Sequence, residues 1–520
     1  MQQMIKNNTY IIIPLLLSFL CLSSCDDYLD TVPDNRMEVD NKDKITKILA
    51  SAYPTSSMIE IAELSSDNIR DNGAQYDIYG QNTQDAYLWK DETTGETDAV
   101  KNLWQGHYAA ITSANQALEA IEKLGNPQSL NPLRGEALLC RAYAHFCLAN
   151  IFCMTYDKSK ASSELGIPYM KHTVNEIDPP EQRGTLEETY NNIQKDIEEG
   201  LPLINDQVYT VPKYHFNKKA AHAFAARFYL YAHQWAKVVE HANAVLGNDP
   251  TEKLRDWKAF SNLDTDWDTR SNAYISNKAD CNLMLQACNS SWPYVYGPYS
   301  IGRRYGCAQT IMTYEILQGP WSGNKDGLYM SNGIWGFEQK YALPKFNGYF
   351  EYTDKTAGIG YLHLVNVAFS TDELLIDRAE AEVMLSQTDQ AASDLGYMFK
   401  SLCGTAYDKT QIVNYYNNVN YMPQPIGRKG FHSIKKHINP QGFSLPADST
   451  AEPLIQCVLH LRRVLSVHEG LRWYDIKRYG IEIAHERSGQ DDDLLTVDDP
   501  RRAIQLPQEA VTAGLQANPR

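Results

Sequence analysis

Apolar side chains recur at helical spacing through much of the first half of the chain. Between residues 98 and 124 they return every three, four or seven positions, the period of one face of an amphipathic helix. The positions concerned are Trp104, Tyr108, Ile111, Leu118 and Ile121. Gly125 and Pro127 follow, and these residues predict the end of that helix.

Further helices are predicted, and most of them occur in pairs. They span residues 133–152, 185–200, 218–232, 234–246, 371–385, 390–402 and 453–480. Thr185 and Glu188 have the spacing of a capping box, which predicts the start of the second of these helices. Helix pairs of this length resemble irregular tetratricopeptide repeats, which bury their apolar faces by stacking on one another.

The pattern changes between the two sets of helices. From about residue 248 to 369 the helical period disappears, and Gly, Pro, Asn, Trp and Tyr dominate. A long loop-rich region inside a compact protein is usually functional. We therefore expect one mainly α unit over residues 25–520, without separate domains. Its helical scaffold would comprise about 97–247 and 371–480, with loop-rich ligand-binding insertions at about 60–96 and 248–369.

The N-terminus has the features of a signal peptide covering residues 1–24. Lys6 precedes an apolar run over residues 10–22, which is too short to span a bilayer. Two serines then lead into Cys25, as in a bacterial lipobox, so we predict that Cys25 carries the lipid anchor. The alternative is an ordinary signal peptide with a buried or disulfide-bonded Cys25.

Composition narrows the classes of partner. The 520 residues include 48 Lys and Arg against 64 Asp and Glu, a formal charge of −16. Such an acidic surface repels phosphate backbones, so no nucleic-acid partner is expected. The 33 Tyr against 14 Phe favour a polar binding surface, because a Tyr ring has an apolar face and a polar tip.

Neither the cysteines nor the acidic residues predict a metal site. No CxxC pair or zinc-type spacing is present. Cys281 and Cys288 lie in a loop-like stretch and could form a disulfide or stay free. The run Asp264, Asp266 and Asp268 imitates the start of a calcium loop, but the Gly and the bidentate Glu that such a loop needs are missing.

A series of motifs in order resembles the SusD/RagB outer-membrane lipoproteins of Bacteroidetes. It includes LWQGHYAAITSANQALEAI, GEALLCRAYAHFCLANIF, ELLIDRAEAEVML and RRVLSVHEGLRWYDIKRYG. The motifs occupy residues 25–30, 103–121, 135–152, 185–204, 216–235, 373–385, 462–480 and 504–519. One departure is Val464-Leu465-Ser466, where the family usually carries a Glu-rich run.

The resemblance implies a fold and a function. The fold would be mainly α, with tetratricopeptide-like helix pairs supporting a loop-rich ligand-binding half. Such a protein would sit on the outer membrane, facing the exterior, as the lid of a SusC-like TonB-dependent transporter. It would capture oligosaccharides or, alternatively, oligopeptides, with no cofactor and no chemistry. The sequence lacks the G-x-S-x-G, Walker A and HExxH motifs of common enzyme classes. A surface glycoside hydrolase is kept as a remote alternative, because its pair of carboxyl groups is defined by their distance in space and not by a sequence motif.

Two segments carry candidate ligand-binding residues. Aromatic rings match the C–H faces of a sugar, while Asp, Asn and Arg side chains bond its hydroxyl rim. The first segment contributes Asp67, Asn68, Arg70, Tyr76, Tyr79 and Trp89. The second contributes Trp292, Tyr294, Tyr296, Tyr299, Trp321, Tyr329 and Trp335. For each single ring, packing within a loop is the competing interpretation.

The motif over residues 469–475 combines charges with Trp and Tyr, but we interpret it as structural. Arg472 and Asp475 are three residues apart on the predicted helix and could form an ion pair. Trp473 would then pack against the scaffold.

Overall fold

The computed structural model describes residues 39–173, 181–298, 302–323, 327–423 and 431–520. Residues 42–520 form one unit, and residues 1–41 form another. The predicted signal peptide and Cys25 lie outside the described residues, as does Tyr299. Among the helices of the described ranges, none has both the length and the apolar character needed to cross a membrane.

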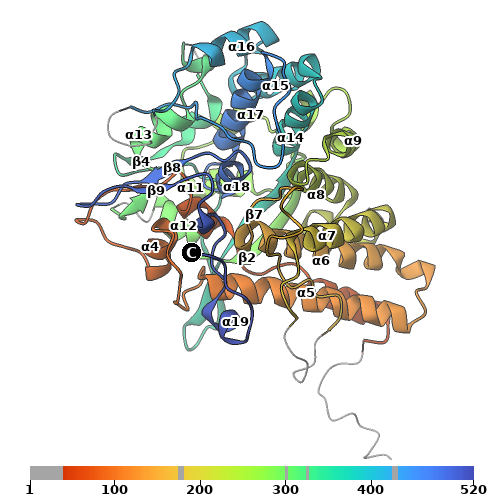
Figure 1. The fold of residues 1–520 in the computed structure, drawn as a ribbon. Coiled ribbons are helices and arrows are strands. Elements are labelled where there is room, and N and C mark those ends of the chain that lie inside the picture. Colours follow the sequence, from red (N-terminus) through yellow and green to blue (C-terminus); the bar gives the residue numbers. More distant parts are fainter. Residues whose placement is uncertain (1–38, 174–180, 299–301, 324–326, 424–430) are drawn as a thin grey trace, which may run out of the picture. The chain divides into compact units, whose positions relative to one another are not determined.

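Helices are the main secondary structure of the unit, and most of the long ones pack against a neighbour in sequence, which confirms the mainly α prediction (Figure 1). The main ones are α5 (Val100–Lys123), α6 (Asn131–Phe152), α7 (Leu186–Gly200), α8 (Lys218–Tyr231), α9 (Trp235–Leu246), α14 (Thr371–Met384), α15 (Thr388–Cys403), α16 (Lys409–Asn418) and α17 (Ala451–Ser466). Helix α14 contacts both α9 and α17, and it therefore links the earlier helix pairs to the later ones.

Local sequence explains how these helices begin and how closely they pack. The predicted capping box is present at α7, where the Glu188 amide donates to Thr185 Oγ1 at 3.1 Å and the Thr185 amide donates to Glu188 Oε2 at 2.8 Å. Gly135 and Gly200 lie where α6 and α7 touch. A Cβ atom at Gly135 would come within 2.7 Å of the Gly200 carbonyl oxygen, so the close approach requires glycine.

The single helix predicted over residues 453–480 is wrong. The structure has α17 and a separate helix α18 (Leu471–Arg478), because His468 and Gly470 adopt left-handed conformations with φ of 73° and 79°. The freed backbone amides of these two residues donate to the Glu63 carboxylate at 2.8 and 3.1 Å. Glu63 belongs to α3 (Ile59–Leu64), so a tertiary contact stabilises the break.

A three-stranded antiparallel sheet occupies part of the region expected to be loops. Its order is β2 (Asn282–Asn289), β7 (Ile359–Ser370), β6 (Tyr349–Asp354). Strand β2 is buried on both faces, so its sequence lacks the alternation that marks a half-exposed strand. Strand β7 leads directly into α14, whose first turn is capped by the Ser370 side chain.

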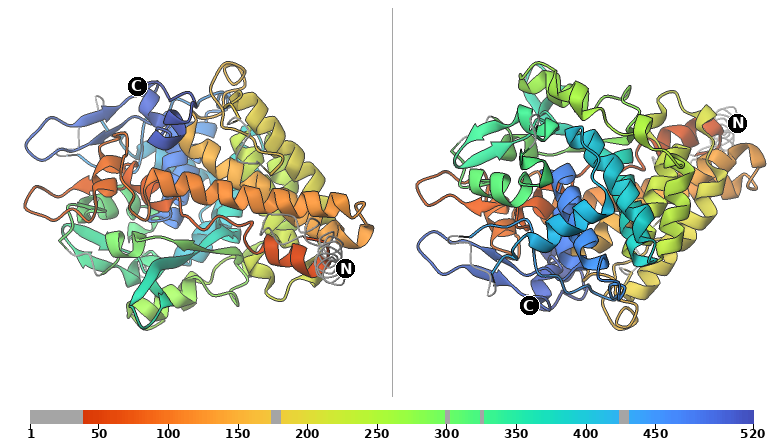
Figure 2. Two further views of the ribbon diagram at one scale, coloured as in Figure 1. Left: turned by 90° about the horizontal axis from the view of Figure 1, so that it is seen from below. Right: turned by 90° about the horizontal axis from the view of Figure 1, so that it is seen from above.

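Two-stranded sheets, short helices and loops make up the remainder. The paired strands are β1 (Arg70–Asp71) with β3 (Tyr305–Gly306), β4 (Trp335–Phe337) with β5 (Lys340–Ala342), and β8 (Ile483–His485) with β9 (Asp493–Leu495). The short helices include α2 (Lys42–Leu49), α4 (Gln81–Tyr87), α10 (Trp257–Ser261), α11 (Trp267–Tyr274), α12 (Trp292–Tyr296), α13 (Gln309–Ile311) and α19 (Gln508–Thr512). The loops near β1, β4 and β8 project on one side of the unit, away from the long helices (Figure 2).

Two of the cysteines and two of the aspartates considered above take part in packing or hydrogen bonding within the protein. Cys281 and Cys288 are free and buried, so they form no disulfide in this structure. Asp266 caps α11 by accepting from the Thr269 amide at 2.8 Å. Asp268 accepts from the Asn347 side chain at 2.6 Å.

Candidate functional site

A buried ion cluster fixes the loop that follows α3. Arg472 donates to Asp67 at 2.8 Å, and Arg463 donates to the Asn68 side chain at 2.8 Å. Asp67 and Asn68, predicted as ligand-binding residues, are only 2% and 0% exposed. Burial raises the pKa of Asp67, but Arg463 and Arg472 outweigh it and hold that pKa well below its usual range. These two side chains therefore position a loop and present no surface to a ligand in this structure.

Arg472 does not pair with Asp475 as expected, because Asp67 occupies its guanidinium. Asp475 instead accepts from Arg462 at 2.9 Å, and Arg462 also contacts Asp377 at 3.0 Å and Glu380 at 2.6 Å. Burial raises the pKa of Glu380, but Arg478 and Arg462 outweigh this and lower it to about 2. The helices α14, α17 and α18 are thus joined through ionised groups in the interior.

The two segments predicted to bind ligand meet on one side of the unit through strands β1 and β3. We call this surface the loop face and define it as residues 70–79, 303–306, 335–342 and 486–488. Asp71 lies at its centre and accepts from Arg304 at 2.8 and 2.7 Å. Its carboxylate also accepts from the Ser488 amide at 3.0 Å. One carboxylate therefore joins three segments that are distant in sequence.

Polar side chains hold the outer part of the loop face together. The Asn72 amide nitrogen donates to the Gln339 carbonyl oxygen at 2.8 Å, and the Gln339 amide nitrogen donates to the Tyr76 hydroxyl at 2.6 Å. The Arg303 guanidinium lies 5.2 Å from the centre of the Tyr79 ring. Arg70, also on this surface, forms an ion pair with Glu486 at 2.7 Å and keeps 39% of its side chain exposed.

A pocket of about 460 Å³ opens beside hairpin β4–β5, and Trp335, Phe337, Pro298 and Asn332 contribute to its lining. Ligand pockets commonly measure about 300–1,000 Å³. The rings of Trp335 and Phe337 are 38% and 62% exposed, and Trp335 Nε1 donates to the Thr265 carbonyl oxygen at 2.9 Å. That hydrogen bond orients an aromatic ring that remains open to solvent.

Four of the predicted aromatic residues lie in the interior instead of on the loop face. Trp89, Trp292, Tyr296 and Trp321 are each at most 4% exposed. Trp292 Nε1 donates to the His468 carbonyl oxygen at 2.8 Å, and Trp321 Nε1 donates to the Leu317 carbonyl oxygen at 2.7 Å. These rings stabilise the loops that pack over them, because burying a large apolar area is favourable in free energy.

The other predicted residues divide between the two environments. Tyr76 and Trp335 lie on the loop face or its adjoining pocket, while Tyr329 is buried. Tyr294 is half-buried and packs close to Gly348. Phe337 was not predicted, although its spacing of two residues from Trp335 is the strand pattern that places two rings on one face. Arg303 carried no recognisable sequence signal.

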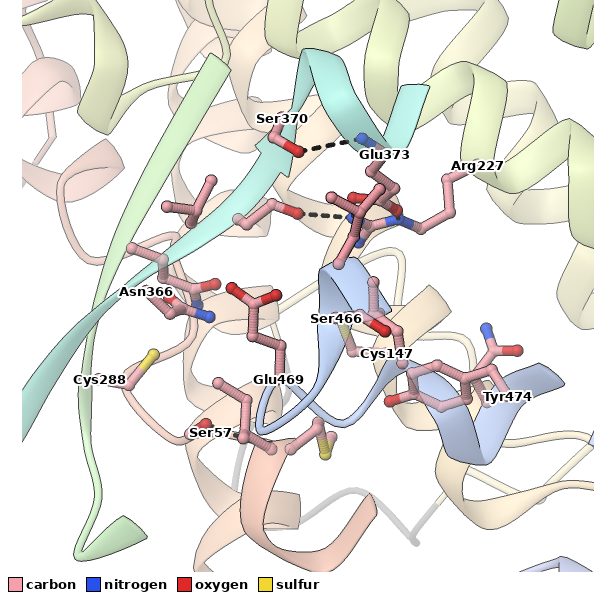
Figure 3. Close-up of a pocket in the computed structure, with 18 of the residues that line it drawn as sticks. Ser57, Cys147, Arg227, Cys288, Asn366, Ser370, Glu373, Ser466, Glu469 and Tyr474 are labelled. Atoms are coloured by element: carbon pink, nitrogen blue, oxygen red, sulfur yellow. Dashed lines mark hydrogen bonds and ion pairs between the residues drawn. The ribbon is translucent and has the colours of Figure 1, made fainter. Parts of the chain in front are cut away.

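A second hollow lies inside the unit between the sheet and the helices (Figure 3). It has a volume of about 100 Å³, and its lining includes Arg227, Glu373, Asn366 and Glu469. Arg227 Nε donates to Glu373 at 2.6 Å, which leaves this pair internally neutralised. Asn366 Oδ1 has no protein partner in the structure, so it is a natural water acceptor. This volume is below the range of about 300–1,000 Å³ that is usual for ligand pockets.

Comparison with known proteins gives a family match and a fold match. Residues 27–230 match the SusD-like family described as starch-binding and associating with the outer membrane. A SusD superfamily protein from Bacteroides vulgatus aligns with a TM-score of 0.60 at 19% identity, covering 91% of this chain and 97% of that one. A putative sugar binding protein from the same organism gives 0.63 at 16% identity, covering 93% and 99%. No curated protein sequence matches the chain.

Proposed function

We propose that this chain, which matches a SusD-like family model over residues 27–230 and shares the fold of SusD superfamily structures, captures nutrient oligosaccharides on the loop face. The observation that carries this proposal is the meeting of two aromatic-rich segments around Asp71. Those segments hold exposed rings beside polar side chains on a surface supported by buried ion pairs.

The chemistry of the loop face suits a sugar. Trp335 and Phe337 offer flat apolar area for the C–H face of a pyranose ring. Arg70, Tyr76 and Gln339 supply donors and acceptors for a rim of hydroxyl groups. A surface open on one side suits an extended chain better than a single enclosed monosaccharide.

The proposal extends to location and partner. A lipid on Cys25 would hold the protein on the outer membrane, facing the exterior. From there it would deliver the ligand to a SusC-like TonB-dependent transporter and would itself perform no chemistry. The sequence motifs of the N-terminus and the description of the matched family support this part of the proposal.

Replacing Trp335 or Phe337 with alanine is expected to weaken oligosaccharide binding about 3- to 10-fold for each ring, the usual contribution of an aromatic contact beyond area burial. The measurement is isothermal titration calorimetry against a panel of neutral and acidic oligosaccharides and short peptides. Tyr352→Ala is the matched control, because that ring is 52% exposed but lies on β6, outside the loop face.

Two outcomes would contradict the proposal. Equal affinities for the wild type and both loop-face variants would reject the site. Binding of peptides alone would reject the oligosaccharide class and favour an oligopeptide-binding protein of the same type.

A further inference from the structure

Two carboxyl groups meet in the interior beneath the loop face. Glu60 lies on α3 and Asp98 lies just before α5, and each is 1% exposed. The Ser291 hydroxyl lies between them, 3.5 Å from Glu60 Oε2 and 2.6 Å from Asp98 Oδ2, and the two carboxyl groups are close enough to share a hydrogen bond. Glu60 Oε1 accepts from the Asn82 side chain at 2.6 Å, and Asp98 Oδ2 accepts from the Ser291 hydroxyl at 2.6 Å. Asp98 Oδ1 is buried and has no hydrogen-bond donor in the structure.

The surroundings do not supply a positive charge. In the described part of the chain, no Lys, Arg or His forms an ion pair with Glu60 or Asp98. The described residues also contain no group of three or more His, Cys, Asp or Glu side chains arranged to hold a metal ion. Two buried carboxylates in contact would both be ionised only at a large electrostatic cost.

The titratable groups nearest to Glu60 and Asp98 come from several elements, and each of them is either acidic or uncharged. Glu92, from the segment before α5, faces both members and is itself near Asp85 of α4 and Glu96. The Cys288 thiol of β2 faces Asp98, and the Tyr79 hydroxyl lies near both carboxyl groups. Arg303 contacts the Tyr79 ring.

We propose that Glu60 and Asp98 share one proton at neutral pH, and that this proton links α4 to the start of α12. One carboxyl group is protonated and donates to the other, with Asp98 Oδ1 and the facing Glu60 oxygen as the two ends of the bond. Such a bond satisfies the one buried oxygen that lacks a donor.

The direction of the pKa shifts agrees with this arrangement. Burial raises the pKa of Glu60 well above its usual range, and Asp98 and Glu92 raise it further. Burial also raises the pKa of Asp98, against the hydrogen bonds from the Ser291 amide and hydroxyl. Two interacting carboxyl groups lose their protons in two separate steps, and the apparent pKa of each step belongs to the pair and not to either residue.

The shared proton has a structural consequence. Asp98 Oδ2 receives both the Ser291 amide at 2.7 Å and the Ser291 hydroxyl, so it fixes the start of α12. The Asn82 bond ties Glu60 to α4, next to the segment that carries Tyr76 and Tyr79. Loss of the proton would create two adjacent buried negative charges. Their repulsion would separate Glu60, which is bound to Asn82, from Asp98, which is bound to Ser291. Any effect on ligand affinity rests on the proposed function, whereas the shared proton itself does not.

The test is urea-induced unfolding of the full chain between pH 5 and 8, in the presence of EDTA. A group whose pKa is raised on folding keeps its proton when folded and loses it on unfolding, so its stabilising contribution falls as the pH rises above the unfolded value. One such proton raises the unfolding constant about tenfold per pH unit. We expect Glu60→Gln and Asp98→Asn each to reduce the slope of log Kunf against pH by about one unit.

Both variants are isosteric and keep a donor between the two side chains. The control is Glu198→Gln, whose carboxyl has a lowered pKa because of Lys237 and is already ionised over this range. It should leave the wild-type slope unchanged. Slopes equal to that of the wild type in both dyad variants would overturn the proposal. A second result would also overturn it: 1 mM CaCl₂ raises the stability of the wild type but not that of Glu60→Gln. A cation would then occupy the place of the proton.

Discussion

Replacing Arg462 with alanine is expected to lower the free energy of unfolding by about 3–5 kcal/mol, the usual cost of removing one partner from a buried ion cluster. Arg462 is 5% exposed. Its guanidinium contacts the carboxyl groups of Asp377, Glu380 and Asp475. Its removal leaves three buried carboxyl groups close together, with Arg478 as the remaining partner of Glu380 and Asp475. The helices α14, α17 and α18 would lose their common contact.

Chemical denaturation at pH 7, monitored by circular dichroism, measures this effect. The control is Lys195→Ala, because the Lys195 side chain is 68% exposed and its pair with Glu199 spans 3.8 Å. An exposed pair of this kind contributes less than about 0.5 kcal/mol. A loss below about 1 kcal/mol in the Arg462 variant would show that the ion cluster does not hold the three helices together.

Alanine at Trp292 or Trp321 is expected to lower the free energy of unfolding by about 3–5 kcal/mol, whereas alanine at Trp335 should cost about 1 kcal/mol or less. The first two rings are 1% and 2% exposed and their indole nitrogens bind backbone carbonyl groups, so truncation leaves a cavity and an unpaired acceptor. The Trp335 ring is 38% exposed.

This difference separates rings that support the loop face from rings that form it. Thermal unfolding and oligosaccharide binding should be measured on the same three variants, with Trp321→Phe as a conservative substitution that refills part of the cavity. If Trp292→Ala or Trp321→Ala kept wild-type stability and lost ligand binding, these residues would face the ligand and the proposed site would be wrong.

The helical scaffold could be predicted because its signals are local. The capping box at Thr185 and the apolar period that ends at Gly125 are both local signals, because each acts within a few residues of a helix end. Strand β2 gave no such signal, since both of its faces are buried and its apolar residues form a nearly continuous run. The break before α18 depends on Glu63, about 400 residues earlier in the chain.

The candidate site was predictable only as a pair of segments. Composition identified aromatic-rich stretches, but nothing in residue type distinguishes Trp292, which packs inward, from Trp335, which remains exposed. Both indoles donate to a backbone carbonyl group, so the difference in burial depends on the residues that the tertiary fold packs around each ring. The meeting of the two segments depends on the ion pair of Asp71 with Arg304, which are separated by 233 positions and have no local signature.

The most direct test of the loop face as the ligand site is hydrogen–deuterium exchange with and without a saturating oligosaccharide, chosen from the calorimetric panel. We expect slower exchange in residues 70–79 and 335–342, with little change in β6 and the helical scaffold. Slower exchange confined to the 349–362 hairpin, or to the residues around the interior cavity, would contradict it.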